Sequence, residues 1–291
     1  MTVSNNLVNS WIFLNEDEPS GTNYNSPDSS YQTLIQSNVY QSVDILFICF
    51  AETLPTSPTT IPAGNGTSYT LQMGGSAHSD GLTNQDYMNY VIRDARANNP
   101  GISICMTLNY GNGNELSQIF PDPNNPDQES ADNFAQNLVS YMEYYGINGF
   151  DIDWEAPIGG ETTQQQFKVL FTAIGEYFDQ NDYYLTLSPA GNNYPNPLGN
   201  LDIPTVNQYF SFVNIQLYGG LSKQMCIDAG MSDSLLAYGA LFESNSQTAQ
   251  DAYQGFTEGN YNKITSWRLN SGNYQFEQQQ QIILHGLVYG S

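Results

Sequence analysis

Short apolar runs, rich in aromatic and β-branched residues, recur along the chain between polar and glycine-containing segments. Runs of about four to eight such residues are typical of buried strands. The pattern predicts eight strands, at residues 11–14, 44–51, 102–109, 149–155, 184–188, 212–218, 235–242 and 264–268.

Between several of these runs, apolar residues fall at spacings of three and four, the period of a helix with one buried face. Helices are predicted at residues 85–97, 129–145, 161–179 and 274–287. Gly146 directly follows the second of these segments and predicts its end. Strands that alternate with helices in a chain of 291 residues favour the α/β class, as a (β/α)8 TIM barrel forming one domain over residues 1–291.

Two longer polar segments interrupt this alternation. Residues 52–82 carry many Pro, Thr, Gly and Ser residues, and residues 110–128 carry Gly, Asn and Pro. Both are expected to be irregular loops that follow the second and third strands. The functional site of such a barrel lies at the C-terminal ends of its strands, so we expect the two loops to form walls of a groove.

Residues 149–155 carry the clearest candidate chemistry. Asp151, Asp153 and Glu155 alternate there with large apolar residues, the last of which is Trp154. Successive side chains of a strand point to opposite faces, so the three carboxylates share one face and Trp154 packs against helices on the other. Like charges at this spacing repel one another, which favours a role in proton chemistry or metal binding over a structural role.

The charge of the chain narrows the choice of partners. Six basic residues against 29 acidic ones leave a net charge of −23, which argues against nucleic acid and anionic membranes and favours a neutral or cationic ligand. The cysteines at 49, 105 and 226 form no CxxC pair, and the histidines are His78 and His285, so a zinc site is not expected. The chain has no glycine-rich phosphate loop of the form that binds dinucleotides. We therefore predict no cofactor.

Two features of the sequence concern secretion and membrane insertion. The first ten residues show neither the basic nor the apolar region of a secretory signal. No apolar run approaches the roughly 20 residues that span a membrane.

Residues 148–155 read Asn-Gly-Phe-Asp-Ile-Asp-Trp-Glu. This run resembles the catalytic signature of family-18 glycoside hydrolases, the chitinases and their relatives, which reads Asp/Asn-Gly-x-Asp-x-Asp-x-Glu on the fourth strand of a (β/α)8 barrel. The fourth predicted strand of this chain carries it. Residues 104–111, 185–189, 213–218 and 264–267 resemble the third, fifth, sixth and eighth strands of the family, in that order.

The chain also departs from the family pattern. Asn109 and Tyr110 stand where the family usually has two glycines, and Ala190 stands where a polar residue often follows the fifth strand. The segment between the seventh and eighth predicted strands is too short for the family's small α+β insertion. Its absence predicts an open groove and endo cleavage.

The resemblance implies a role for each of four residues. Glu155 would be the general acid that protonates the glycosidic oxygen. Asp153 would bind the acetamido N–H of the sugar and stabilise the cation that forms, while Asp151 would share a proton with Asp153. Tyr218 would donate its hydroxyl to the acetamido carbonyl. Cleavage would retain configuration through an oxazolinium ion formed by the substrate itself.

Further residues are expected to bind the sugar. The family ends its eighth strand in a tryptophan, and Trp267 would be the apolar floor under the sugar ring. Period two along residues 212–218 places Asn214 and Gln216 on one face with Tyr218. Tyr110 lies in a loop above the expected groove, where it could stack on a sugar. The residues alone leave the role of Trp11 open.

The favoured prediction is an endo-acting chitinase that hydrolyses β-1,4 bonds between N-acetylglucosamine units. Chitin or N-acetylglucosamine oligomers would be its partners, and we expect a secreted or extracellular monomer because chitin lies outside most cells that degrade it. Two alternatives stay open: an endo-β-N-acetylglucosaminidase acting on N-glycans, and a non-catalytic glycan-binding lectin on the same barrel. A metal ion on the three acids is less favoured, because they come from a single strand and the aromatic residues suit a sugar better.

Overall fold

The computed structural model describes residues 6–14, 22–60, 62–63, 68–75, 77–111, 113–191 and 197–290. It confirms the predicted fold class, a (β/α)8 barrel in which parallel strands alternate with helices along the chain. The chain forms two compact units. The first consists of Met1–Phe50, Met73–Ile104 and Ala237–Ser291, and the second of Ala51–Gln72 and Cys105–Leu236.

The first unit contains the strands at both ends of the chain. Strand β1 (Leu7–Phe13) pairs in parallel with β2 (Ile45–Pro55) and with β9 (Lys263–Trp267), and β9 pairs with β8 (Leu236–Leu241). Its helices are α1 (Ser30–Gln36), α2 (Asn84–Asn98), α8 (Ala249–Glu258) and α9 (Tyr274–Tyr289), with short 3-10 turns η1 (Val39–Ser42) and η5 (Glu243–Asn245).

The second unit contains the middle of the chain. Strand β5 (Gly149–Trp154) lies between β4 (Ser103–Leu108) and β6 (Tyr184–Pro189), and β6 pairs with β7 (Phe212–Ile215), all in parallel. The remaining elements are β3 (Tyr69–Met73), α3 (Gln128–Tyr145), α4 (Ile158–Glu161), α5 (Gln164–Asn181), α6 (Ile203–Tyr209), α7 (Lys223–Asp228), η2 (Ser117–Ile119), η3 (Leu217–Gly219) and η4 (Asp233–Leu235).

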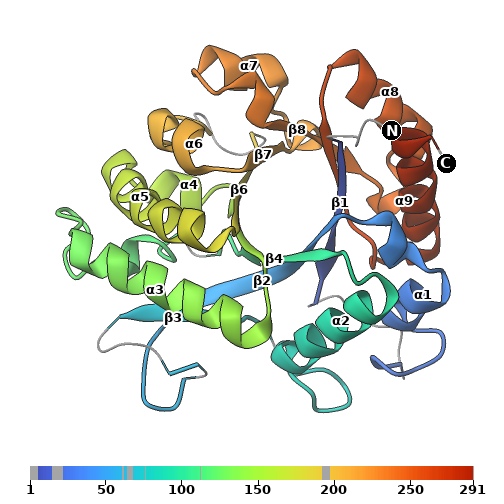
Figure 1. Ribbon diagram of the computed structural model, residues 1–291, viewed down its shortest axis with the longest axis horizontal. Helices are drawn as coiled ribbons and strands as arrows, with labels where there is room; N and C mark the ends of the chain where they lie inside the picture. Colours follow the sequence, from blue (N-terminus) through green and yellow to red (C-terminus); the bar gives the residue numbers. More distant parts are fainter. Residues whose placement is uncertain are drawn as a thin grey trace. The chain divides into compact units, whose positions relative to one another are not determined.

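Helices α3 and α5 show why these segments are helical. Thr163 caps α5 by accepting a hydrogen bond from the backbone N–H of Gln166, whose side chain bonds back to the cap. Gly146 ends α3 at a φ of 68°, as the sequence predicts. The two helices lie side by side (Figure 1). Their predicted inward residues are buried at Phe134, Leu138, Tyr141, Met142, Phe167, Leu170, Phe171, Ile174 and Phe178.

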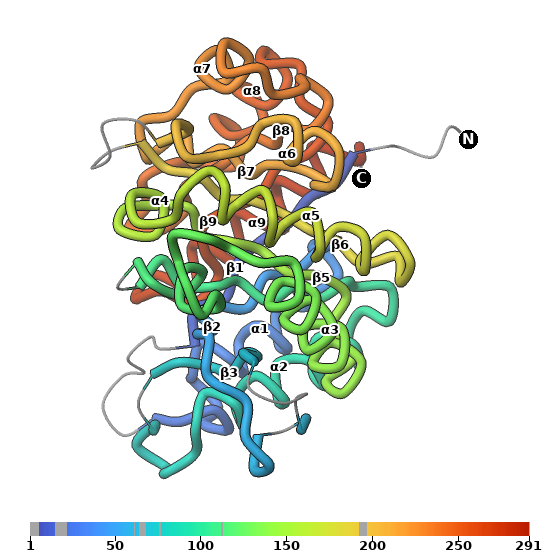
Figure 2. Tube along the Cα trace, turned by 90° about the vertical axis from the view of Figure 1, so that its left-hand side faces the viewer, coloured from blue at the N-terminus to red at the C-terminus, as the bar shows by residue number. Residues whose placement is uncertain are grey.

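The last helix closes the first unit against its first strand. Val8, Phe256, Ile264 and Leu284 belong to one buried apolar cluster that joins β1, β9, α8 and α9. Figure 2 shows the end of α9 beside the start of β1, where the Tyr289 hydroxyl donates to the backbone oxygen of Asn6 at 2.7 Å. The core of this unit therefore depends on residues from both ends of the sequence.

All eight predicted strands are present, with ends that differ by a few residues. The prediction that residues 52–82 are loop is wrong in part, because β2 continues to Pro55 and β3 forms beyond it. The prediction that strand 212–218 reaches Tyr218 is also wrong, since β7 ends at Ile215 and η3 follows. Among the described residues, five helices had no counterpart among the predictions: α1, α4, α6, α7 and α8.

That residues 1–291 form one domain stays a prediction. Within the described residues, no helix combines the length and the apolar character needed to cross a bilayer.

Candidate active site

The three acids predicted from the sequence lie on β5 and directly after it. Asp151 is fully buried and Asp153 is 6% exposed, while Glu155 is half-buried where the chain leaves the strand. The backbone oxygen of Glu155 accepts a hydrogen bond from Gly159, so the turn into α4 begins at this residue. Glu155 thus stands at the C-terminal end of a barrel strand, the usual place for catalytic groups in this fold.

Gly149 explains how β5 packs so closely to its neighbours. A Cβ at this position would lie 2.6 Å from both the Cys105 Sγ and the Tyr184 Cβ. Only glycine fits between β4 and β6 here, and its place fixes the register of the acids that follow.

Strand β6 supplies the hydrogen bonds to Asp151. In the parallel register, Thr186 lies opposite Asp151 and Ser188 opposite Asp153. The Thr186 hydroxyl donates to Asp151 Oδ1 at 2.6 Å, and the Ser188 hydroxyl donates to the same oxygen at 2.9 Å. Burial raises the pKa of Asp151 to about 6, although these hydroxyls and Thr107 oppose the shift. Asp151 therefore ionises only near neutral pH.

Asp153 lies between two other carboxyl groups. Burial raises its pKa well above the ordinary value, and the charges of Glu155 and Asp151 add to this effect. A hydrogen bond to Glu155 acts in the same direction, because it favours the protonated form of Asp153. These effects together favour the protonated form of Asp153, whose side chain is hydrogen-bonded to Glu155.

Strand β7 and the residue after it support this pair from the side. Gln216 donates from Nε2 to Asp153 Oδ1 at 3.0 Å and to the backbone oxygen of Ser188 at 3.0 Å. Asn214 donates to the Ser188 hydroxyl at 3.2 Å. Both side chains are buried and bonded within the protein. Their predicted contact with a sugar stays a prediction. Gln216 contacts Asp153 directly, while Asn214 bonds to Ser188, which in turn bonds to Asp151.

Tyr218 and Tyr110 lie on the irregular segments that follow strands. Tyr218 is half-buried within η3, so the two-residue alternation used to place it does not apply. Tyr110 follows β4 and is 39% exposed. Asn109, which replaces a glycine of the family pattern, donates its backbone N–H to the backbone oxygen of Ala51 at 2.9 Å.

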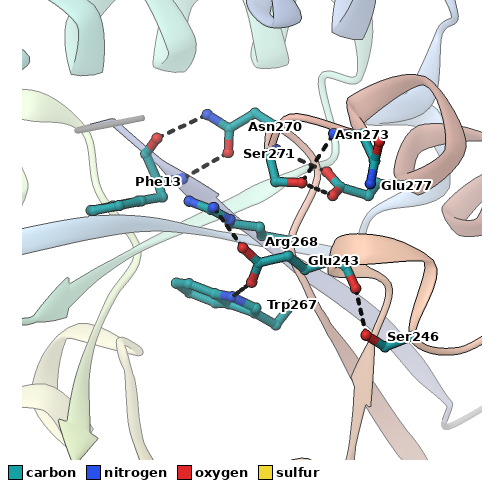
Figure 3. A network of polar contacts seen from close by, with 9 residues as sticks. All are labelled: Phe13, Glu243, Ser246, Trp267, Arg268, Asn270, Ser271, Asn273 and Glu277. Atoms are coloured by element: carbon teal, nitrogen blue, oxygen red, sulfur yellow. Dashed lines mark hydrogen bonds and ion pairs between the residues drawn. The ribbon is translucent and has the colours of Figure 1, made fainter. Parts of the chain in front are cut away.

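Trp267 lies in the first unit, at the end of β9. Its indole is tilted against Trp11 with ring centroids 5.9 Å apart, and it also meets the rings of Phe13 and Phe50. Trp11 itself is buried and stacks on Phe47 at 4.9 Å, which makes it a core residue. The indole N–H of Trp267 donates to Glu243 (Figure 3).

Other predictions from the signature are confirmed. Trp154 is fully buried, meets Phe167 of α5 edge-on at 5.3 Å and donates its indole N–H to the backbone oxygen of Pro197. Cys49 and Cys105 are buried free thiols.

Sequence reasoning missed three residues with a clear part in these networks: Thr186, Ser188 and Glu243. Thr186 and Ser188 alternate on β6 as hydroxyl residues between leucines, and this pattern could have indicated a polar inward face. Glu243 gave no local signal, because its importance depends on a residue 24 positions further along the chain.

Comparison with solved structures identifies the fold at full length. A family-18 chitinase, ChiB from Flavobacterium johnsoniae, superposes with a TM-score of 0.64 at 14% identity, covering 98% of this chain and 94% of that one. A mutant class V chitinase from Nicotiana tobaccum, solved in complex with NAG4, gives a TM-score of 0.64 at 12% identity, covering 97% and 99%.

Sequence comparison gives the family. Probable chitinase 10 of Drosophila melanogaster is 22% identical over 141 residues, which are 45% of this chain and 6% of that protein. The chain therefore spans a small part of the length of this curated relative. The pattern of the family described as "Glycosyl hydrolases family 18" matches residues 22–271. With this match over most of its length, the chain belongs to glycosyl hydrolase family 18.

Proposed function

We propose that this chain is an endo-acting chitinase that hydrolyses β-1,4 bonds between N-acetylglucosamine units. The chain belongs to glycosyl hydrolase family 18, and two similar structures are chitinases, one of them in complex with an N-acetylglucosamine oligomer. One observation carries the proposal: the buried carboxyl of Asp153 is hydrogen-bonded to Glu155 at the end of β5. This arrangement offers both a proton source and a partner for the acetamido group.

Glu155 acts first in the proposed reaction. Its carboxyl transfers a proton to the glycosidic oxygen as the bond from that oxygen to the anomeric carbon breaks. The acetamido oxygen of the same sugar forms a bond to the anomeric carbon and gives an oxazolinium ion. Glu155, now a carboxylate, takes a proton from water while the water oxygen bonds to the anomeric carbon. The bond from the acetamido oxygen to that carbon breaks at the same time, which restores the acetamido group. The configuration is retained without a carboxylate nucleophile.

Asp153 and Asp151 support these reaction steps through their charges. When Asp153 releases its proton, its carboxylate accepts a hydrogen bond from the acetamido N–H and stabilises the positive charge of the oxazolinium ion. Asp151 is buried beside it, and four contacts from Thr186, Ser188 and Thr107 hold it in place. In this proposal it exchanges a proton with Asp153.

The remaining roles concern binding of the sugar. The hydroxyl of Tyr218 donates to the acetamido carbonyl, and the face of Trp267 packs under the ring that carries that group. Tyr110 stacks on a second sugar from the loop after β4, where its exposed ring is open to solvent. Gln216 acts on the substrate mainly through Asp153, and Asn214 acts through Ser188, which bonds to Asp151.

The test compares two substrates under the same conditions. The purified chain is incubated with the hexamer of N-acetylglucosamine and with a high-mannose glycoprotein, and early products are identified by mass spectrometry. We expect dimers to tetramers from the hexamer and an intact glycoprotein. Release of the glycan without cleavage of the hexamer would overturn the proposal in favour of an endo-β-N-acetylglucosaminidase. Binding of the hexamer without any hydrolysis would overturn it in favour of a lectin.

We also propose that the protein acts outside the cell, because its polymeric substrate lies there, and that it is a monomer. The strong negative charge does not oppose this substrate, since chitin is uncharged. Size-exclusion chromatography with light scattering and a comparison of culture medium with cell lysate test the two statements.

A further inference from the structure

The Glu243 carboxylate binds two consecutive residues, Trp267 at the end of β9 and Arg268 directly after it. Glu243 Oε2 accepts a hydrogen bond from the indole N–H of Trp267 at 2.7 Å. Its Oε1 accepts one from Arg268 Nη2 at 2.8 Å. Figure 3 shows the Glu243 side chain between these two donors. Each oxygen of Glu243 thus has a different partner, and both bonds include a charged group, which makes them short and strong.

The register between β8 and β9 explains how Glu243 reaches this position. Leu241 pairs with Trp267, so Glu243 follows two residues beyond the pairing point. The backbone N–H of Phe242 donates to the Trp267 backbone oxygen at 2.8 Å, which keeps the chain beside β9. The Ser246 hydroxyl donates to the Glu243 backbone oxygen at 2.8 Å and holds the η5 turn in place.

Two aromatic rings and one guanidinium group surround Trp267. Phe13 and Phe50 lie at centroid distances of 6.4 Å and 6.2 Å, at tilts of 35° and 30°. The guanidinium of Arg268 lies 5.4 Å from the Trp267 ring and 5.1 Å from the Phe13 ring. Ring pairs and cation–π contacts of this kind accept a range of offset and edge-on arrangements. The hydrogen bond to Glu243 is directional, and it selects one orientation of the indole.

We infer that Glu243 is a positioning residue, which sets the plane of Trp267 for stacking on an N-acetylglucosamine ring. This inference rests on the proposed function, in which Trp267 is the floor of the sugar site. Arg268, buried at 6% exposure, neutralises the Glu243 charge and keeps the carboxylate in place. Glu243 acts through Trp267 and does not itself take part in proton transfer.

The role predicts which kinetic constant depends on Glu243. A sugar that stacks on the indole needs the ring plane in one orientation, in the ground state as much as in the transition state. Loss of the hydrogen bond between Glu243 and Trp267 therefore weakens binding of the ground state and of the transition state equally. This raises KM and leaves kcat nearly unchanged. A loss of kcat at constant KM would instead indicate a group that acts only in the transition state.

The experiment compares Glu243→Ala, Glu243→Gln and Ser246→Ala with the parent chain on the N-acetylglucosamine tetramer. We expect Glu243→Ala to raise KM about ten-fold, roughly the effect of one lost charged hydrogen bond. Glu243→Gln keeps an oxygen for the indole N–H and should raise KM by about three-fold. Ser246→Ala removes a bond of the same turn but keeps the carboxylate, so its KM should match the parent value.

A second readout follows the indole directly. The Trp267 indole N–H resonance, assigned by its loss in Trp267→Phe, should shift in Glu243→Ala and stay in place in Ser246→Ala. An unchanged KM in Glu243→Ala with full parental activity overturns the positioning role and leaves the proposed function intact. An equal rise of KM in Ser246→Ala also overturns it, since the turn and not the carboxylate would then matter. A parent chain that neither cleaves nor binds the tetramer overturns the proposed function and this inference together.

Discussion

Gln216 holds Asp153 through one amide nitrogen that also bonds to the neighbouring strand. Its Nε2 lies 3.0 Å from Asp153 Oδ1 and 3.0 Å from the Ser188 backbone oxygen. The amide thereby links the end of β7 to β6 and to the acid in the middle of the cluster. Among the causes that act on the Asp153 pKa, this bond is one that lowers it, so it favours the ionised form that the proposed reaction needs.

Replacing Gln216 with Leu should therefore reduce activity. The change leaves Asp153 without this donor in a buried place, and we expect kcat/KM on N-acetylglucosamine oligomers to fall about ten-fold, since a buried donor of this kind is worth about 1 kcal/mol or more. Gln180→Leu, an exposed glutamine on α5 that bonds only to its own helix backbone, is the matched control. Equal rates for Gln216→Leu and the parent chain would exclude this role.

Asp151 should make stability depend on pH. Its pKa is about 6 in the folded chain against an ordinary 3.8, so between these values the unfolded chain loses a proton that the folded chain keeps. The contribution of Asp151 to the free energy of unfolding is complete below pH 3.8. It decreases as the pH rises from 3.8 to about 6, and it does not change further above that pH. At about 1.4 kcal/mol per pKa unit, the loss amounts to as much as about 3 kcal/mol.

Urea unfolding of the parent chain and of Asp151→Asn between pH 4 and pH 7, values chosen to bracket this window, measures the effect. The amide does not titrate, so the difference in unfolding free energy between the two proteins reports the titration of Asp151 together with its effect on Asp153. The parent should lose stability relative to the variant as pH rises. A difference that is constant across the range contradicts the proposed burial of the charge.

Gly149 should tolerate no side chain. Alanine there would place its Cβ 2.6 Å from Cys105 Sγ and 2.7 Å from the Tyr184 backbone oxygen. Overpacking at this level typically costs about 1–3 kcal/mol, and it displaces the strand that carries the acids. We expect Gly149→Ala to lower both the unfolding midpoint and kcat. Gly272→Ala, which meets nothing within 4 Å, should change neither.

Substrate assistance can be tested without changing the protein. If the acetamido oxygen forms the new bond to the anomeric carbon, a thiazoline analogue of N-acetylglucosamine resembles the intermediate and should inhibit competitively. Fully deacetylated chitosan lacks that oxygen and should not be cleaved. Cleavage of this polymer at the rate seen with chitin oligomers would rule out the mechanism.

The sequence predicted β5 and its acids correctly because the strict alternation of acids with Phe150, Ile152 and Trp154 fits only a strand. The inward face of α5 was equally clear, because its large apolar residues repeat at helical spacing. Helix α8 was missed because its buried positions include the small residues Ala249 and Ala252, which give a weak periodic signal.

Contacts between distant residues could not be predicted in the same way. Thr186 bonds to Asp151 because of the register between two parallel strands, and Glu243 reaches Trp267 because β8 ends two residues earlier. Neither relationship has a local pattern in the sequence. The alternation from Asn214 to Tyr218 predicts a strand, but the chain turns into η3 after Ile215.

The replacement of Glu155 with Gln tests the central claim most directly. Glutamine has nearly the same shape but holds no proton to donate, so the proposed general acid would be lost while the sugar site is kept. We predict that kcat on the N-acetylglucosamine tetramer falls at least about 10³-fold and that the dissociation constant for the same tetramer stays within about three-fold. Parental activity in Glu155→Gln would contradict the account.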